Sequence, residues 1–123
     1  MLKYAKGVDE RDMMLYRGCF AHDAVVVFDG TTYASAEAWF AFVESALDGF
    51  GATQHMLGPS LIDIDGDTAH CRTDVQALHY LLNEPGTTLT LWGTYETGMR
   101  RVDGVWKIAS HNVVVRGTRK QSG

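Results

Sequence analysis

The sequence predicts an α+β fold in which a curved antiparallel sheet wraps around N-terminal helices and forms a cone with a pocket inside. The chain of 123 residues is long enough for one hydrophobic core and too short for two. Apolar residues recur at helical spacing up to Gly51, and β-branched runs separated by turn signals follow it. Helices first and antiparallel strands afterwards are typical of a sheet that helices cover on one face.

Two consecutive helices are predicted before the first strand. Their apolar stripe continues across a polar segment, Asp9 to Asp12, that separates them. The residues of the stripe are Leu2, Ala5, Met13, Tyr16 and Phe20. Asp9 shares the face of Leu2 and Ala5, so its carboxylate is expected at or near the core, where an unpaired charge is costly. We therefore expect Asp9 to have a partner.

A short strand and a third helix follow. Residues 24–29 are β-branched and end in an Asp-Gly turn signal. Ser35 is suited to cap the start of the helix, and Gly49 is suited to end it. The apolar residues of this helix are Trp39, Phe40, Val43, Ala46, Leu47 and Phe50. These residues predict that one side of the helix packs in the core, and Trp39 could also line a lipophilic pocket.

The rest of the chain predicts a sheet. The strands are expected at 53–57, 61–65, 68–82, 87–101 and 105–116. Asp65-Gly66 and Asp103-Gly104 are hairpin turn signals, and the segment 83–86 predicts a longer turn. Residues 117–123 carry no apolar pattern and are expected to form a flexible C-terminal tail. A single domain would then span residues 1–116.

Alternation of side chains along the strands predicts which polar residues face the pocket. The odd positions of the strand 68–82 are mostly apolar, and His79 is the ionisable residue among them. Tyr95 has the corresponding place in the next strand. In the last strand the parity of Trp106 and Ile108 puts Asn112 inside, and His111 would point away unless a bulge intervenes.

His55, at the start of the sheet, is the expected partner of Asp9. A carboxylate bound to one imidazole nitrogen fixes the tautomer and raises the basicity of the other nitrogen, which makes such a pair a general base. The alternative is a structural pair that locks the first helix to the sheet. No ligand cluster for a metal and no phosphate-binding loop is present, so neither a metal nor another cofactor is expected.

Composition excludes several classes of partner. The net charge of −4 and the pI of about 5.6 provide no basic field for nucleic acid. The longest apolar run, 24–28, is much shorter than a membrane span requires. Charged residues interrupt the first fifteen positions, which is unlike a signal peptide. Cys19 and Cys71 have no metal or disulfide spacing. We therefore expect a cytoplasmic protein with no membrane partner.

Six short segments form a pattern through their order and spacing. They are YAKGVDERD at 4–12, FAHDAVV at 20–26, QHMLG at 54–58, DGDTA at 65–69, GTY at 93–95 and RVDGVWKI at 101–108. Together they resemble the SnoaL-like proteins of the nuclear-transport-factor-like superfamily. The resemblance covers nearly the whole domain and implies the cone-shaped α+β fold of that superfamily, a cystatin-like roll.

Within the superfamily the functional likeness is to scytalone dehydratase, hexachlorocyclohexane dehydrochlorinase and bile-acid 7α-dehydratase. These lyases pair a helix aspartate with a histidine at the start of the sheet, and the resemblance places that pair on Asp9 and His55. It places a dehydratase tyrosine on Tyr4 and a second catalytic histidine on His79. A basic or amide residue that assists the leaving group in some members would fall near His111 or Asn112. The positions expected to contact substrate are Tyr4, Tyr95, Trp39, His111 and Asn112.

Three functions remain open. The first is a cofactor-free lyase, of dehydratase or dehydrohalogenase type, acting on a small lipophilic cyclic substrate through Asp9, His55 and His79. The second is an isomerase like ketosteroid isomerase or a polyketide cyclase, with a lone carboxylate as base. The third is a non-catalytic module that binds a small hydrophobic ligand. Apolar residues expected on the outer face, Trp92 and Val113 among them, predict a homo-oligomer, either dimer or trimer.

Overall fold

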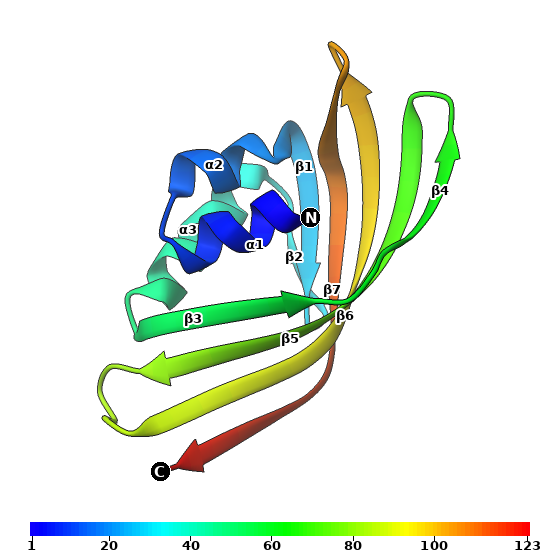
Figure 1. Ribbon diagram of the computed structural model, residues 1–123. Helices are drawn as coiled ribbons and strands as arrows, with labels where there is room; N and C mark the ends of the chain where they lie inside the picture. Colours follow the sequence, from blue (N-terminus) through cyan, green and yellow to red (C-terminus); the bar gives the residue numbers. More distant parts are fainter.

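The computed structural model describes residues 1–123, in which a seven-stranded curved sheet holds three helices on its concave side (Figure 1). The strand order is β2-β1-β7-β6-β5-β3, and β4 pairs with the part of β5 that β3 leaves free. The strands are β1 (Phe20–Phe28), β2 (Thr31–Tyr33), β3 (Phe50–Leu57), β4 (Leu61–Asp65), β5 (Thr68–Leu81), β6 (Thr87–Val102) and β7 (Val105–Ser122). The predicted α+β fold with a curved sheet is confirmed.

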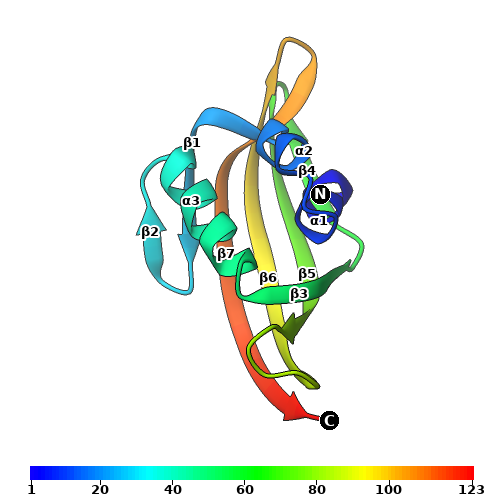
Figure 2. The same cartoon turned by 90° about the vertical axis from the view of Figure 1, so that its left-hand side faces the viewer.

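The three helices are α1 (Leu2–Asp9), α2 (Met13–Gly18) and α3 (Ala36–Leu47). Two of them begin at side-chain caps. Asp12 accepts a hydrogen bond from the backbone N–H of Leu15 at 3.1 Å, and Ser35 accepts one from Ala38 at the same distance. Figure 2 shows the helices in front of the long strands β5, β6 and β7. None of the helices has the length and apolar character needed to cross a membrane.

A bulge interrupts the pairing of β6 with β7. Gly98 pairs with Ser110, but Met99 pairs with Ile108, so Ala109 is an extra residue on β7. An inserted residue reverses the side to which the following side chains point. The parity expected from Ile108 therefore fails after the bulge, and this decides which residues of β7 line the interior.

Three sequence-based expectations about the sheet need correction. Residues 117–123 are not a flexible tail, because β7 continues to Ser122 and pairs with β6 up to Thr87. Strand β2 was not predicted; it is only three residues long and pairs antiparallel with β1. The sheet is also not wholly antiparallel, because β1 runs parallel to β7. The parallel pairing joins strands distant in sequence, which residue patterns do not specify. Strand β2 follows β1 directly across the Asp29-Gly30 turn, and its three residues are too few to form a recognisable pattern.

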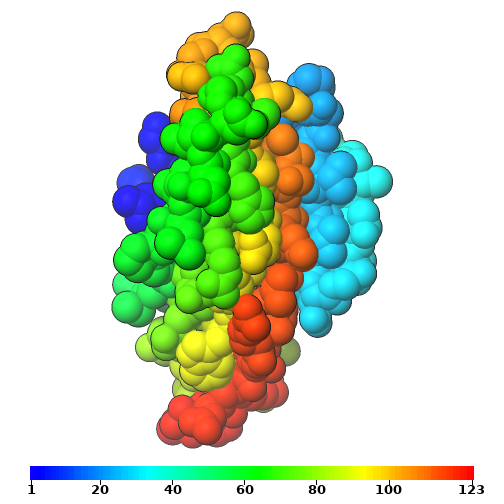
Figure 3. Space-filling model, turned by 90° about the vertical axis from the view of Figure 1, so that its right-hand side faces the viewer, coloured from blue at the N-terminus to red at the C-terminus, as the bar shows by residue number.

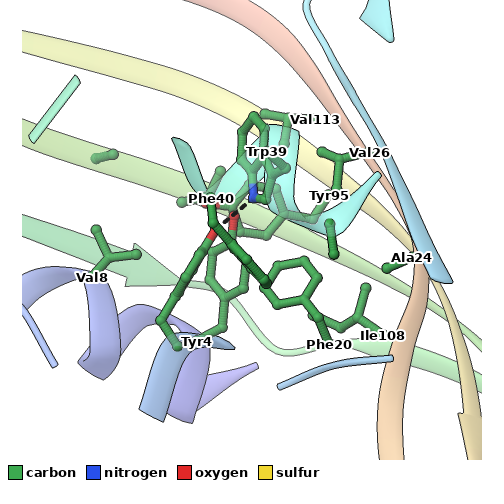
Figure 4. Close-up of a cluster of buried hydrophobic side chains, with 14 residues drawn as sticks. Tyr4, Val8, Phe20, Ala24, Val26, Trp39, Phe40, Tyr95, Ile108 and Val113 are labelled. Atoms are coloured by element: carbon green, nitrogen blue, oxygen red, sulfur yellow. Dashed lines mark hydrogen bonds between the residues drawn. The ribbon is translucent and has the colours of Figure 1, made fainter. Parts of the chain in front are cut away.

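The core fills the space between the sheet and the helices. Figure 4 shows side chains from α1, β1, α3, β6 and β7 that converge there. The buried residues include Tyr4, Tyr16, Phe20, Val26, Trp39, Phe40, Tyr95, Ile108 and Val113. Aromatic rings dominate this cluster, and Tyr4 packs with its ring centroid 4.8 Å from Tyr16 and 5.4 Å from Tyr95. The core thus brings several hydroxyl groups into a mainly apolar interior.

Candidate functional site

A cavity of about 220 Å³ lies between the helices and the concave side of the sheet. Its wall is mainly apolar, with side chains from α1, α2, α3 and five strands. The apolar lining residues are Val8, Phe28, Trp39, Phe42, Val43, Ala46, Leu47, Phe50, Ala77, Leu89, Leu91 and Val113. The lining residues with a hydroxyl or imidazole are Tyr4, Tyr16, His55, His79 and Tyr95. Apolar walls with a few convergent polar groups are typical of small-molecule sites.

Asp9 and His55 are in direct contact at one edge of this cavity. Asp9 is the last residue of α1, and His55 lies in β3, so the contact joins the helix to the sheet. Asp9 Oδ1 lies 2.7 Å from His55 Nδ1, and the backbone N–H of His55 donates to Asp9 Oδ2 at 2.8 Å. The exposed fractions of the two side chains are 19% and 12%. Both groups are therefore largely withdrawn from solvent.

The contact determines the tautomer of neutral His55. An ionised carboxylate has no proton to give, so Nδ1 of His55 carries the hydrogen and donates it to Asp9. Nε2 is then left with its lone pair and can accept a proton. Because His55 lines the cavity, this arrangement has the chemical requirements of a general base.

The pKa of Asp9 is consistent with an ionised carboxylate. Burial alone would raise this pKa, but hydrogen bonds from the side chain and backbone of His55 and from Thr53 hold it below its ordinary value. Thr53 Oγ1 donates to Asp9 Oδ1 at 3.0 Å. Thr53 was not among the residues expected from sequence. Its position two residues before His55 places it on the same side of β3, which is the signal that could have identified it.

His79 lies beside His55 in the cavity wall. The two imidazole centroids are 5.8 Å apart, with the rings nearly perpendicular. His79 Nδ1 lies 3.0 Å from the backbone carbonyl oxygen of Leu89, which can only accept, so Nδ1 carries the hydrogen and Nε2 is an acceptor. Burial lowers the pKa of His79. The residue is thus placed inside as expected, in its neutral form.

Tyrosines form the other polar part of the cavity wall. Tyr4 and Tyr95 line it as expected, and Tyr16 joins them although the sequence assigned it only to the core. Trp39 also lines the cavity, and its indole N–H donates to the hydroxyl of Tyr16 at 2.9 Å (Figure 4). Burial raises the pKa of Tyr4, Tyr16 and Tyr95, so all three keep their protons and can act as donors.

The placement of His111 and Asn112 differs from the expected parity. The bulge at Ala109 turns His111 inward, where its side chain is buried, and turns Asn112 outward, where it is exposed. Asn112 therefore does not reach the cavity, and its expected contact with substrate is wrong. His111 does not line the cavity either, because it lies behind Tyr4, with its Nε2 3.2 Å from the hydroxyl of Tyr4. It supports the cavity wall through that tyrosine and through Tyr95, whose ring centroid lies 4.7 Å from its own.

Comparison with known proteins identifies the family to which the fold belongs. A family model described as a SnoaL-like domain matches residues 1–112. A search of curated proteins finds no match.

Several solved structures share the architecture. A candidate scytalone dehydratase from Novosphingobium aromaticivorans is 22% identical with a TM-score of 0.90, covering 100% of this chain and 83% of its own. A hexachlorocyclohexane dehydrochlorinase from Novosphingobium barchaimii is 21% identical with a TM-score of 0.85, covering 98% and 84%. A candidate aromatic ring hydroxylase from Novosphingobium aromaticivorans is 23% identical with a TM-score of 0.88, covering 98% and 87%.

At these identities the solved structures establish the fold and not the activity. The family model spans most of the chain, and the curved sheet with N-terminal helices is the architecture of these neighbours. The chain therefore belongs to the SnoaL-like domain family.

Proposed function

We propose that the protein is a lyase that catalyses β-elimination, of dehydratase or dehydrohalogenase type, on a small lipophilic cyclic substrate. The observation that carries this proposal is the 2.7 Å contact of Asp9 with His55 at the wall of an apolar cavity. Family membership and neighbours that include dehydratase-like and dehydrochlorinase proteins support a role of lyase or isomerase type. Titratable groups paired in a cleft are a common mark of functional sites.

In the proposed reaction His55 is the base. Its Nε2 takes a proton from a carbon next to an activating group, and the electrons of that C–H bond form the new double bond. The leaving group on the neighbouring carbon departs with the electrons of its own bond. His55 then carries a positive charge, which the carboxylate of Asp9 stabilises through Nδ1. This scheme requires no metal or cofactor.

His79 is proposed to orient the leaving group. Its neutral Nε2 can accept a hydrogen bond from a hydroxyl of the substrate. A direct role as general acid would require a protonated imidazole, and burial disfavours that form. Once His55 has taken the proton of the substrate, it is the more available proton donor for a departing hydroxide. A leaving group held at His79 would lie close to His55, because the two imidazoles are neighbours.

The tyrosines are proposed to bind an oxygen of the substrate. Tyr4, Tyr16 and Tyr95 hold their protons and lie in the cavity wall together with His55. A hydrogen bond from one of them would strengthen as negative charge develops on that oxygen during proton removal. The volume of about 220 Å³ is below the range usual for drug-sized ligands, which favours a small substrate.

The geometry favours this reading over the two alternatives. An isomerase with a lone aspartate base needs a carboxylate that is free to reach the substrate, but both oxygens of Asp9 are engaged by His55 and Thr53. A purely binding module gives no reason for a buried acid–base pair beside the cavity.

The test is a panel of hydroxylated and halogenated cyclic compounds, assayed for elimination in the presence of a chelator. We expect His55→Gln to lower turnover by about 10²- to 10⁴-fold, the range usual for general-base groups. Asp9→Asn should also reduce it strongly, because it removes control of the tautomer and the stabilising charge. The control is His70→Gln, since His70 lies on the outer face beside Glu96. Turnover that survives His55→Gln, or that is lost with chelator and restored by zinc, would contradict the mechanism.

A further inference from the structure

Arg11 joins α1 to the strand that carries His55. It lies in the turn between α1 and α2 with a φ of 58°, a region unfavourable for residues other than glycine, asparagine and aspartate. Its Nη1 donates to the carbonyl oxygen of Val8 at 2.8 Å and to Thr53 Oγ1 at 2.9 Å, and its Nη2 donates to the carbonyl oxygen of Gly51 at 2.5 Å. The guanidinium therefore holds the end of α1 against β3.

The hydrogen bonds around Thr53 can run in only one direction. A guanidinium has donors and no acceptor, so Thr53 Oγ1 accepts from Arg11. The proton of Thr53 is then directed to Asp9 Oδ1, 3.0 Å away. A positive charge on the far side of the hydroxyl polarises it and strengthens this donation.

The carboxylate of Asp9 is consequently held at three points. Oδ1 accepts from Thr53 and from Nδ1 of His55, and Oδ2 accepts from the backbone N–H of His55. Only one rotation of the carboxylate satisfies all three donors. Without the hydroxyl of Thr53, Oδ1 would have a single donor and the carboxylate could turn away from the imidazole.

We propose that Arg11 and Thr53 are positioning residues for the acid–base pair, acting in the order Arg11, Thr53, Asp9, His55. The inference rests on the proposed function, because positioning matters for catalysis only if His55 is the base. Neither residue lines the cavity, so neither is proposed to touch the substrate. Their effect passes through the orientation and charge of Asp9.

Other charged groups near Asp9 are few. Lys6 and Glu10 on the same helix pair with each other on the surface, at 3.2 Å. Asp12, at the start of α2, caps that helix. From the sheet, His79 and Tyr95 face the site, and burial keeps both of them neutral. The hydrogen bonds from Thr53 and His55 are therefore the main local influences that can be removed by substitution.

The experiment follows the carboxyl signal of Asp9 and the Nδ1–H signal of His55 by NMR in the full chain. Thr53→Val removes the hydroxyl with little change of shape, and Thr53→Ser keeps it. Arg11→Gly removes the guanidinium and suits the positive φ. Thr73→Val is the matched control, because buried Thr73 bonds only to Ser60 Oγ.

We expect Thr53→Val and Arg11→Gly to shift the pKa of Asp9 upward, toward its ordinary value, and to weaken the Nδ1–H signal through faster exchange. Thr53→Ser and Thr73→Val should resemble the unaltered protein. The inference is overturned if both Thr53→Val and Arg11→Gly leave the two signals unchanged, or if Thr53→Ser changes them as much as Thr53→Val does. Should Thr53→Val fail to fold, Arg11→Gly alone decides the outcome.

These signals need no substrate, so the result is independent of the proposed reaction. If the signals respond as expected and no compound is turned over, the proposed function fails and the positioning network stands. If compounds are turned over and the signals do not respond, the network fails and the function stands. If the proposed function and the positioning network are both correct, Thr53→Val should lower kcat with little change in KM.

Discussion

Several buried ionisable residues of this protein are held in their neutral forms by the core, and His111 is the clearest case. Only 1% of its surface is exposed, and burial lowers its pKa to about 3. Its two ring nitrogens are both satisfied, Nδ1 by Thr97 at 2.9 Å and Nε2 by Tyr4 at 3.2 Å. Neutral His111 therefore helps to hold Tyr4 in the cavity wall.

This burial predicts a loss of stability in acid. Between the ordinary value of 6.5 and about 3, the unfolded chain binds a proton at His111 that the folded chain does not. The free energy of unfolding should be fully retained above pH 6.5 and fall as the pH decreases through this window, by at most about 1.4 kcal/mol per pH unit from this residue. Urea denaturation over this pH range measures the slope.

The variant His111→Gln should flatten that slope, since glutamine can still hydrogen-bond but does not titrate. His22→Gln is the control, because His22 is exposed on β1. A slope that is the same in His111→Gln and in the unaltered protein would show that other groups cause the acid sensitivity. His79, whose pKa burial also lowers, would be the next residue to test.

At the scale of secondary structure, α3 is the helix that closes one side of the cavity. Trp39, Phe42, Val43 and Leu47 line the cavity from this helix. The helix begins at Ser35, whose side chain accepts the hydrogen bond from Ala38. The position of this cavity wall thus depends on the Ser35 cap, which is recognisable in the sequence.

Ser35→Ala should lower the free energy of unfolding by about 1 kcal/mol, because the first turn of α3 loses its cap. Ser45→Ala is a matched control in the exposed part of the same helix. It should be neutral or slightly stabilising, since alanine has the higher helix propensity. Equilibrium denaturation of both variants gives the comparison. Equal effects of the two substitutions would mean that the cap contributes no stability.

At the scale of the whole molecule, apolar side chains are exposed at the end of the sheet that carries β4. The exposed fractions are 70% for Leu61, 56% for Ile62 and 66% for Ile64. Strand β4 lies at an edge, since it pairs only with β5, and Figure 3 shows it along one side of the outer face. Of the outer-face residues first expected to drive association, Val113 is buried inside, whereas Trp92 is partly exposed.

We expect the protein to self-associate through this end. An exposed apolar edge strand is a common site of pairing between chains. Light scattering at micromolar concentration should give a mass above that of one chain, and the double variant Ile62→Lys and Ile64→Lys should lower it. Met56→Lys is the control, since Met56 is exposed on β3 at another part of the sheet. A monomer mass for the unaltered protein would contradict the expectation.

Much of the fold is predictable from the sequence because its signals are local. The cap at Ser35 and the Asp-Gly turns mark helix and strand ends within one or two residues, and alternation along β5 correctly places His79 inside. Strand β2, which follows β1 across an Asp-Gly turn, is too short to form a recognisable pattern. The strand order and the parallel pairing of β1 with β7 depend on contacts between distant segments. Residue patterns do not record such contacts.

For the site, the amino-acid sequence identifies the available residue types: an aspartate on a buried helical face, a histidine at the start of the sheet and tyrosines among the core positions. Which of these residues come into contact depends on how distant segments pack together. The packing of α1 on β3 brings Asp9 to 2.7 Å from His55 and adds Arg11 and Thr53 behind them. A single extra residue in β7, Ala109, turns Asn112 outward, since an inserted residue reverses the side to which the next side chains of the strand point.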